Sequence, residues 1–494
     1  MPLSGYIMKS ANWFHPFITG ESGMSLSFFN TMDRKVEEFL PINRGEVRMY
    51  TCGPTVYNYA HIGNFRAYIF EDLLRRTLEY FGYRVRQVMN LTDVDDKTIR
   101  DSRAASLPLR EFTARYKKAF FEDLKTLNIE PAEVYPAATD HIPQMLRLIG
   151  VLLEKGFAYQ AEDRSIYFSI DKFPDYGKLA KIDRENQRSG VRIKNDEYAK
   201  DSVADFALWK AWDENDGEVF WESPWGRGRP GWHIECSAMS SEYLGDHFDI
   251  HTGGIDNMFP HHEDEIAQSE AASGKKWVNY WLHCAHLMVN GEKMSKSLGN
   301  FFTLRDLLEK GWKGPEIRWV LIGAHYRKKL NFTFDALEQA HDTLVRFAEF
   351  FRRMRECSAA GDGSEIASAL AEADNAFAAA MGDDLNISGA LAAMFDLQRA
   401  ANRLADAGAL SGAGAARVLE LFRKFDRVIG CLPLEETGEP EIPQEIVSLA
   451  EERAAARKAK NFAESDRLRD LIASKGYAIE DAPGGVYRLR KAGI

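Results

Sequence analysis

Two lysines three residues apart mark the stretch Lys293-Met294-Ser295-Lys296-Ser297, which has glycines on either side at Gly291 and Gly299. Ammonium groups offset phosphate charge, and small residues let a backbone approach a ligand closely. The stretch therefore suits a loop that folds over a polyphosphate. A solvent-exposed basic loop is the alternative interpretation of the same residues.

A second phosphate-type element lies upstream, at His61-Ile62-Gly63-Asn64. Residues 47–52 are β-prone and end at a Gly-Pro turn, whereas residues 65–74 repeat apolar side chains at helical spacing. His61 and Asn64 thus lie between a predicted strand and a predicted helix, where free backbone N–H groups and the helix dipole favour an anion. A surface histidine is the alternative, but the lysine stretch favours the phosphate role.

Metal-binding residue types gather further along the chain. Seven of the twelve histidines fall between His233 and His286. Pro260 suits the first turn of a helix, so His261 and Glu265 would lie four residues apart on one helical face, able to hold a single ion. Cys52 and Cys236 would complete a set of two thiolates, an imidazole and a carboxylate, which suits Zn²⁺. Buried structural cysteines and a chance histidine–glutamate spacing are the alternative.

These residues need elements that bring them together. Short apolar strands alternate with helical patterns from residue 25 to about 125, and the pattern returns at 248–250 and 281–289. Such alternation predicts a parallel sheet with crossover helices, in which ligands bind beyond the carboxyl ends of the strands. His251-Thr252-Gly253-Gly254 is expected to follow one strand end, where its glycines would admit a nucleotide. A plain turn is the alternative there.

The predicted fold class is α/β: a Rossmann-type parallel-sheet catalytic domain with an insertion, then a helical bundle and a small C-terminal α+β unit. We expect an N-terminal extension (1–24), the two catalytic halves (25–125 and 226–290) around a connective insertion (126–225), the lysine loop with linking helices (291–332), the bundle (333–435) and the small domain (436–494). Predicted helices span 334–356, 364–381, 388–407, 413–430 and 443–475, and Gly476 closes the last before strands at 477–480 and 486–490.

Composition limits the function classes. Five irregularly spaced cysteines indicate a reducing cytoplasm, and no run of eighteen apolar residues predicts a membrane span. A net charge of −11 argues against indiscriminate nucleic-acid binding. From residue 453 to the end, however, ten Lys/Arg face five Asp/Glu, which indicates either an RNA contact or a solvated helix face. We expect a monomer.

The two phosphate-type elements resemble the HIGH and KMSKS signatures of class I aminoacyl-tRNA synthetases, and the surrounding residues resemble the cysteinyl-tRNA synthetase family. The matching blocks are Tyr50–Tyr57, Asn90–Lys97, Arg229–Cys236 and Phe259–Glu265, in family order. Asn64 replaces the last histidine of HIGH, although its amide can still donate to a phosphate. Asp264 stands where the family often has asparagine.

The resemblance implies that ATP activates L-cysteine as cysteinyl-adenylate, with Mg²⁺, and that cysteine then passes to tRNA(Cys). It assigns Cys52, Cys236, His261 and Glu265 to one Zn²⁺ per chain. It places His61, Lys293 and Lys296 in catalysis, His61, Asn64, Gly253, Gly254 and Lys296 at ATP, and Thr92, Trp232 and His251 at the substrate. Zinc would select cysteine over serine because it prefers soft sulfur, whereas a shaped pocket separates near-isosteres only by about 10².

Three alternative functions would use some of the same residues. A cysteine ligase of the same lineage would join cysteine to an amino sugar, but such ligases resemble truncated synthetases, so residues 333–494 favour tRNA. A non-catalytic RNA-binding paralogue is disfavoured by intact His61, Lys293 and Lys296. A zinc hydrolase would not need the lysine loop.

Overall fold

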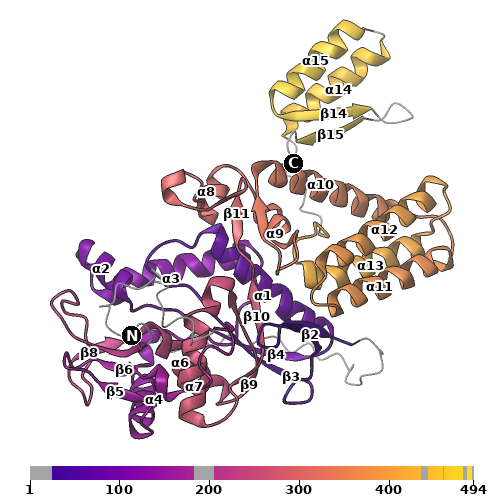
Figure 1. The fold of residues 1–494 in the computed structure, drawn as a ribbon. Helices are drawn as coiled ribbons and strands as arrows, with labels where there is room; N and C mark the ends of the chain where they lie inside the picture. Colours follow the sequence, from indigo (N-terminus) through magenta and orange to yellow (C-terminus); the bar gives the residue numbers. More distant parts are fainter. Residues whose placement is uncertain (1–24, 183–204, 436–442, 460, 482–486, 492–494) are drawn as a thin grey trace. The chain divides into compact units, whose positions relative to one another are not determined.

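The computed structural model describes residues 25–182, 205–435, 443–459, 461–481 and 487–491 (Figure 1). A four-stranded parallel sheet in the order β10-β9-β3-β4 forms the core of the catalytic region. The strands are β3 (Glu46–Thr51), β4 (Arg84–Met89), β9 (Phe248–Gly254) and β10 (Val278–Cys284). Tyr50 pairs with His251 in the register of β3 and β9. The strand order reverses direction between these two strands, and their carboxyl ends flank a typical ligand-binding position.

Helices cover the sheet, and its strands are therefore buried. α1 (Ile62–Tyr80) follows β3, whereas α6 (Trp232–Leu244) and α7 (His261–Ser273) precede β9 and β10, respectively. Residues 248–253 of β9 are all buried, as in a strand covered on both faces. The prediction that His251–Gly254 follows a strand end is wrong, because these residues are the last four of β9. A continuously buried strand does not alternate, so the sequence does not mark its end.

Further helices and a second sheet lie between β4 and β9, and α4, β5, β6 and β7 among them fall within the predicted insertion (126–225). These elements are α2 (Asp96–Ala104), α3 (Leu109–Thr126), α4 (Ile142–Glu154), and the antiparallel strands β5 (Ala158–Gln160), β6 (Ile166–Phe168), β7 (Phe206–Ala211) and β8 (Gly228–Pro230). Ile149 of α4 and Trp209 of β7 share a buried cluster with Ile234 of α6 and Ala267 of α7. The insertion therefore supports the two helices that carry most of the predicted metal ligands.

The lysine stretch begins at the last residue of β12, in a small sheet with the order β12-β11-β13. Its strands are β11 (Leu287–Val289), β12 (Glu292–Lys293) and β13 (Leu330–Phe332), and α8 (Leu304–Glu309) and α9 (Gly314–Ile322) lie between β12 and β13. The amino-terminal hairpin joins β1 (Ser27–Asn30) and β2 (Lys35–Glu38). A helical bundle follows, with α11 (Ala367–Gly382), α12 (Ile387–Asp406) and α13 (Gly412–Ile429) within three residues of the predicted helices.

A buried guanidinium group connects the bundle to the catalytic region. Arg318 on α9 is fully buried, and its Nη2 lies 2.5 Å from Oδ2 of Asp72 on α1. It also donates to the carbonyls of Leu127 (3.0 Å) and Ile429 at the end of α13 (2.7 Å). Arg76 pairs with the same carboxylate at 2.8 Å. Burial alone would raise the pKa of Asp72, but the charges of Arg318 and Arg76 lower it below its usual value.

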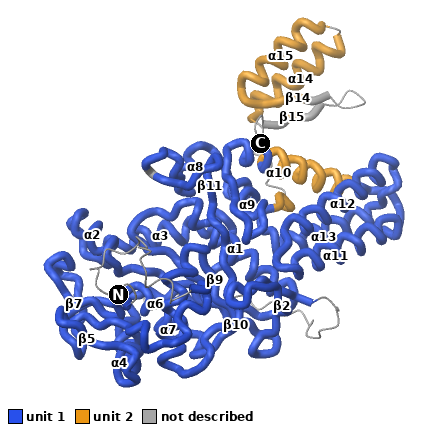
Figure 2. The backbone as a smooth tube through the Cα atoms, in the orientation of Figure 1, with its two compact units in different colours: residues 1–340, 357–431 blue, residues 341–356, 432–494 orange. Residues whose placement is uncertain are grey.

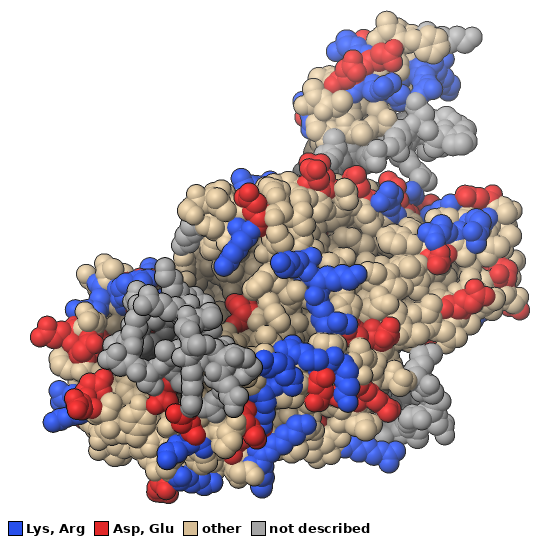
Figure 3. Space-filling view, viewed as in Figure 1, with Lys and Arg blue, Asp and Glu red and all other residues tan. Residues whose placement is uncertain are grey.

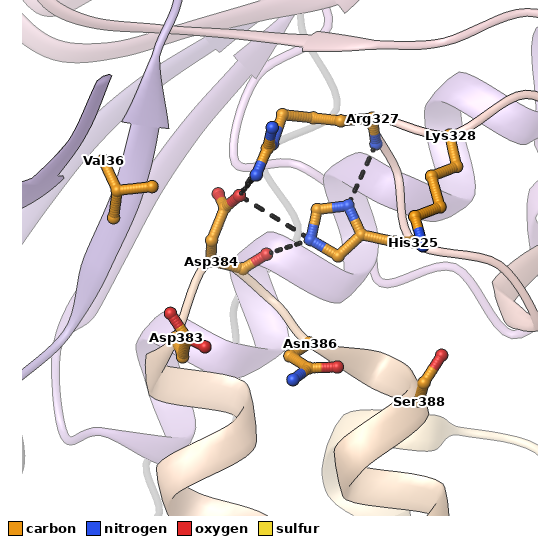
Figure 4. Close-up of a pocket in the computed structure, with 8 residues that line it drawn as sticks. All are labelled: Val36, His325, Arg327, Lys328, Asp383, Asp384, Asn386 and Ser388. Atoms are coloured by element: carbon orange, nitrogen blue, oxygen red, sulfur yellow. Dashed lines mark hydrogen bonds and ion pairs between the residues drawn. The ribbon is translucent and has the colours of Figure 1, made fainter.

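A second junction lies at the turn between α11 and α12 (Figure 4). The carboxylate of Asp384 accepts hydrogen bonds from the backbone N–H of Phe29 (2.8 Å), the Tyr326 hydroxyl (2.5 Å) and Nε of Arg327 (2.7 Å). Asp384 has φ +52°, a left-handed conformation that aspartate tolerates better than most residues. The turn is thus fastened to β1 and to the segment before β13.

Residues 341–356 and 432–494 form a compact unit separate from residues 1–340 and 357–431 (Figure 2). It contains the larger part of α10 (Phe334–Glu356), α14 (Gln444–Lys458), α15 (Phe462–Ser474) and the antiparallel strands β14 (Tyr477–Asp481) and β15 (Tyr487–Lys491). The prediction of one helix over 443–475 is wrong. The Asn461 side chain accepts from the Glu464 N–H (3.3 Å) and begins a new helix.

Two sequence predictions, the N-terminal extension at 1–24 and the strand at 486–490, extend beyond the described residues. Residues 1–24 and Val486 lie outside the described residues. Within the described ranges, no helix has the length and apolar character needed to cross a bilayer.

Candidate active site

The four predicted metal ligands come together at the carboxyl end of β3. Cys52 directly follows β3, Cys236 lies on α6, and His261 and Glu265 lie on α7. One ligand atom from each falls within 4.8 Å of all the others, and the four residues are at most 8% exposed. Nε2 of His261 lies 2.6 Å from Oε1 of Glu265 and 3.6 Å from Sγ of Cys236. Two thiols, an imidazole and a carboxylate at these separations can hold a metal ion.

The pKa values of Cys236 and His261 indicate which protons a bound cation would displace from the cluster. Burial alone would raise the pKa of Cys236, but hydrogen bonds with Cys52 and His261 lower it to about 6. Burial alone would lower the pKa of His261, but the charges of Glu265 and Cys236 raise it well above its usual value. Metal binding requires a deprotonated thiol and a neutral imidazole, so a cation entering the cluster would displace protons. All five cysteines of the chain are free.

A second set of donors overlaps the first. Cys52, His251, His262 and Glu265 also place one ligand atom each within 4.8 Å of one another. Nε2 of His262 lies 3.3 Å from Sγ of Cys52, and Nε2 of His251 lies 2.7 Å from Oε2 of Glu265. His251, predicted at the substrate, is therefore fully buried against the metal cluster. Sequence reasoning missed His262 as a candidate ligand; its position beside His261 was the available signal.

His61 caps the helix that begins at the first phosphate-type element. Its Nδ1 accepts from the Asn64 N–H (3.1 Å), while Oδ1 of Asn64 accepts from the His61 N–H (3.1 Å). This reciprocal pair fixes His61 at the positive end of α1. Asn64 thus has a capping role that does not depend on a second imidazole.

The lysine stretch packs against the same helix end. The ring of Phe301 meets that of His61 with centroids 5.1 Å apart, and the Ile62 N–H donates to the Phe302 carbonyl (3.0 Å). A Cβ added to Gly63 would lie 3.0 Å from Nδ1 of His61 and 3.1 Å from Cε of Met294, so the glycine lets these two side chains approach without displacement. The structure therefore brings the two phosphate-type elements together. Lys293 is exposed at the end of β12, and the side chain of Lys296 lies outside the described part of the chain.

The remaining predicted contacts lie around this centre. The Thr92 hydroxyl donates to Oε2 of Glu235 (2.9 Å), and the ring of Trp232 stacks on His261 with centroids 4.1 Å apart. A Cβ at Gly253 would lie 2.9 Å from Cε1 of His262, and one at Gly254 would meet Oδ1 of Asp256. These glycines leave space that any side chain would fill.

A buried acid lies behind the metal cluster. Glu71 on α1 is fully buried, and its Oε1 accepts from the Thr252 hydroxyl (2.9 Å). Its Oε2 has no hydrogen-bond partner among the described residues. Burial raises the pKa of Glu71 to about 8, although the hydrogen bond from Thr252 has the opposite, smaller effect.

Comparisons with known proteins agree with this geometry. Residues 38–342 match the family described as "tRNA synthetases class I (C) catalytic domain", and residues 376–433 match the DALR domain. Mycobacterium tuberculosis methionyl-tRNA synthetase in complex with methionyl-adenylate shares the fold, with a TM-score of 0.59 and 16% identity over 78% of this chain and 92% of that one. The fold and the paired phosphate-type elements thus define a class I aminoacyl-tRNA synthetase.

Closer relatives specify the family. Cysteine–tRNA ligases of Protochlamydia amoebophila and Chlamydia muridarum are 53% and 51% identical, each over 94% of this chain and over 98% and 99% of their own lengths. The chain belongs to the cysteine–tRNA ligase family. The resemblance and the predicted fold class are confirmed, and the family match favours a tRNA ligase over the amino-sugar ligase and the non-catalytic paralogue.

Proposed function

We propose that this enzyme activates L-cysteine with ATP, transfers it to tRNA(Cys), and recognises the cysteine thiol through a Zn²⁺ ion held by Cys52, Cys236, His261 and Glu265. The buried donor cluster at the carboxyl end of β3 carries this proposal. When bound, Zn²⁺ supplies a soft Lewis acid that favours a deprotonated thiol over a hydroxyl. The two thiols match that softness, and burial of the whole set favours a dehydrated ion.

The chain's own residues then position the reacting groups. A carboxylate oxygen of cysteine bonds to the α-phosphorus of ATP, and the bond from that phosphorus to the β-phosphate oxygen breaks, which releases pyrophosphate with Mg²⁺. His61 at the start of α1, together with Lys293 and Lys296, offsets the charge on the phosphates. The terminal ribose hydroxyl of tRNA next attacks the carbonyl carbon, and AMP leaves. Asn64, Gly253 and Gly254 contribute to ATP binding, and Trp232 lines the amino-acid side, with the buried Thr92 and His251 as supporting residues.

Cysteine-dependent ATP–pyrophosphate exchange tests the assignment. Lys296→Ala should slow exchange by about 10² or more, as loss of one donor from an oxyanion hole does. Lys276→Ala is a matched control, because this exposed lysine precedes the amino end of β10. A near-normal rate for Lys296→Ala would refute the phosphate role.

Metal content tests the zinc assignment directly. Purified enzyme should contain one zinc per chain, and chelator-treated enzyme should lose cysteine-dependent exchange and regain it when zinc returns. Full activity without metal, with serine still excluded, would refute recognition of the thiol by zinc.

The basic carboxyl-terminal region is proposed to contact the tRNA. Residues 453–494 carry ten Lys/Arg and five Asp/Glu, and Arg469 is exposed on α15. Lys and Arg side chains also run across the middle of the larger unit on the face drawn in Figure 3. Arg469→Glu should raise the KM for tRNA and leave pyrophosphate exchange unchanged; equal effects on both reactions would count against an RNA contact.

We also propose that the enzyme acts as a cytoplasmic monomer.

A further inference from the structure

The side chain of one asparagine bridges the lysine stretch. Nδ2 of Asn300 donates to the backbone carbonyl of Lys293 (3.2 Å), and Oδ1 of Asn300 accepts from the backbone N–H of Ser295 (2.8 Å). A peptide carbonyl can only accept and a peptide N–H can only donate, so these two partners fix the orientation of the amide. We call this pair of hydrogen bonds the Asn300 bridge. It holds both peptide groups that flank Met294.

A tight turn brings Asn300 back to the lysine stretch. Ser295 leads into a turn of 3₁₀ helix over Lys296–Leu298. Gly299 follows with φ +64°, a left-handed conformation that glycine adopts at little cost, and it turns the chain back. Lys296 therefore lies inside the loop that the Asn300 bridge closes.

The residues that follow Asn300 are docked on the start of α1. The ring of Phe301 packs against that of His61 with centroids 5.1 Å apart, and the Phe302 carbonyl accepts from the Ile62 N–H (3.0 Å). Asn300 directly precedes Phe301 in the chain. Its side chain therefore joins the lysine stretch to a segment whose position is fixed at His61.

Only an amide supplies what the bridge requires at this length of side chain. Asparagine carries a donor and an acceptor, whereas an ionised aspartate only accepts and leucine does neither. The bridged segment has contacts on both sides, because Lys293 pairs with Met288 of β11 and the methyl of Met294 lies beside Gly63. The bridge thus closes the loop where the strand pairing of β12 ends.

We infer that Asn300 is a positioning residue whose bridge holds the lysine stretch closed on the segment docked at His61. Both hydrogen bonds use backbone atoms of the stretch, and neither uses an atom that the proposed function assigns to the phosphates. Loss of the bridge should lower the fraction of enzyme in which the loop is closed, and the rate should fall with that fraction. The inference rests on the proposed phosphate role of Lys293 and Lys296 and adds what positions them.

Limited digestion with trypsin, which cleaves after lysine and arginine, tests the bridge without reference to activity. Asn300→Leu keeps the approximate size and removes both hydrogen bonds. Cleavage after Lys293 and Lys296, identified by mass spectrometry, should become about tenfold faster, because cleavage follows the population of the opened loop. Cleavage at the remaining sites should keep its wild-type rate, which shows that the fold is intact.

Two further variants make this result specific. Leu298→Ala alters a side chain that is 58% exposed in the same loop, and it should be cleaved as slowly as wild type. Asn300→Asp keeps the acceptor and loses the donor, so its cleavage rate should lie between those of wild type and Asn300→Leu. Equal cleavage of Asn300→Leu and wild type, equal acceleration in Leu298→Ala, or a rate for Asn300→Asp outside that interval would overturn the inference.

Pyrophosphate exchange separates the inference from the proposed function. Asn300→Leu should slow exchange about tenfold, and in the Lys296→Ala background it should cost clearly less, because the bridge acts through the lysine stretch. A full further tenfold loss in the double variant would overturn the inference and leave the proposed function intact. A near-normal rate for Lys296→Ala alone would instead refute the phosphate role, and the digestion would still decide whether Asn300 holds the loop.

Discussion

Glu71 gives a sharp prediction about pH and stability. Its pKa is raised to about 8 in the folded enzyme, from an ordinary value of 4.5. In the unfolded chain the carboxyl group ionises above pH 4.5, whereas in the folded enzyme it stays protonated until about pH 8. The contribution of the protonated carboxyl group to the free energy of unfolding is therefore fully present below pH 4.5, and it is lost as the pH rises through 8. Glu71→Gln removes this loss, because glutamine is neutral in both states.

The size of the gain follows from the two pKa values. Each unit by which the pKa of the folded enzyme exceeds that of the unfolded chain corresponds to about 1.4 kcal/mol in the free energy of unfolding. Glu71→Gln should therefore stabilise the enzyme by about 1 kcal/mol at pH 5, about 3 kcal/mol at pH 7 and about 4 kcal/mol at pH 8. The glutamine carbonyl can keep the hydrogen bond from Thr252, which lies 2.9 Å from the present oxygen. The gain should level off above pH 8.

Urea denaturation at pH 5, 6, 7 and 8 measures this dependence, provided that the slope with urea is the same for both proteins. Glu154→Gln, at an exposed position at the end of α4, makes the same chemical change and should leave the profile of the wild type unaltered. A gain for Glu71→Gln that does not grow with pH, or a loss of stability at pH 8, would refute the reasoning.

Three further substitutions test other parts of the structure. Arg318→Leu should lower the free energy of unfolding by about 3–5 kcal/mol, because it leaves a buried carboxylate without one of its partners; a loss below about 1 kcal/mol in urea would contradict this. Asn64→Ala should cost about 1 kcal/mol in thermal unfolding by removing its half of the capping pair with His61, and unchanged stability would argue against that cap. Gly253→Ala should weaken zinc binding roughly tenfold because its Cβ would displace His262; chelator competition that shows wild-type affinity would disprove the close contact.

The fold was largely predictable because its local signals agree with one another. Apolar periodicity after Gly63 predicted α1, and the Ala- and Leu-rich helices of the bundle were found to within a few residues. The break between α14 and α15 was missed, because no proline or glycine marks it and the cap depends on the Asn461 side chain. The end of β9 was misplaced because burial on both faces removes alternation.

The candidate site could be predicted only in part from the sequence. Four-residue spacing put His261 and Glu265 on one helical face, and the family resemblance added Cys52 and Cys236. The second donor set was not predicted: His262 is adjacent to the predicted ligand His261, but His251 lies on a different element and has no diagnostic spacing to either. Only three-dimensional proximity links such residues.

Helix α1 has a consequence for communication within the enzyme. The helix begins at Ile62, directly after His61, and its Asp72 pairs with Arg318, which also donates to the carbonyl of Ile429 at the end of α13. The eleven residues from Ile62 to Asp72 span about 16 Å of stiff helix, so α1 links the proposed phosphate site to the helical bundle. A macromolecule that binds and shifts the bundle would therefore also shift the amino end of α1. A substitution that breaks the pair of Arg318 with Asp72 should therefore also alter the binding of ATP at the proposed phosphate site near His61.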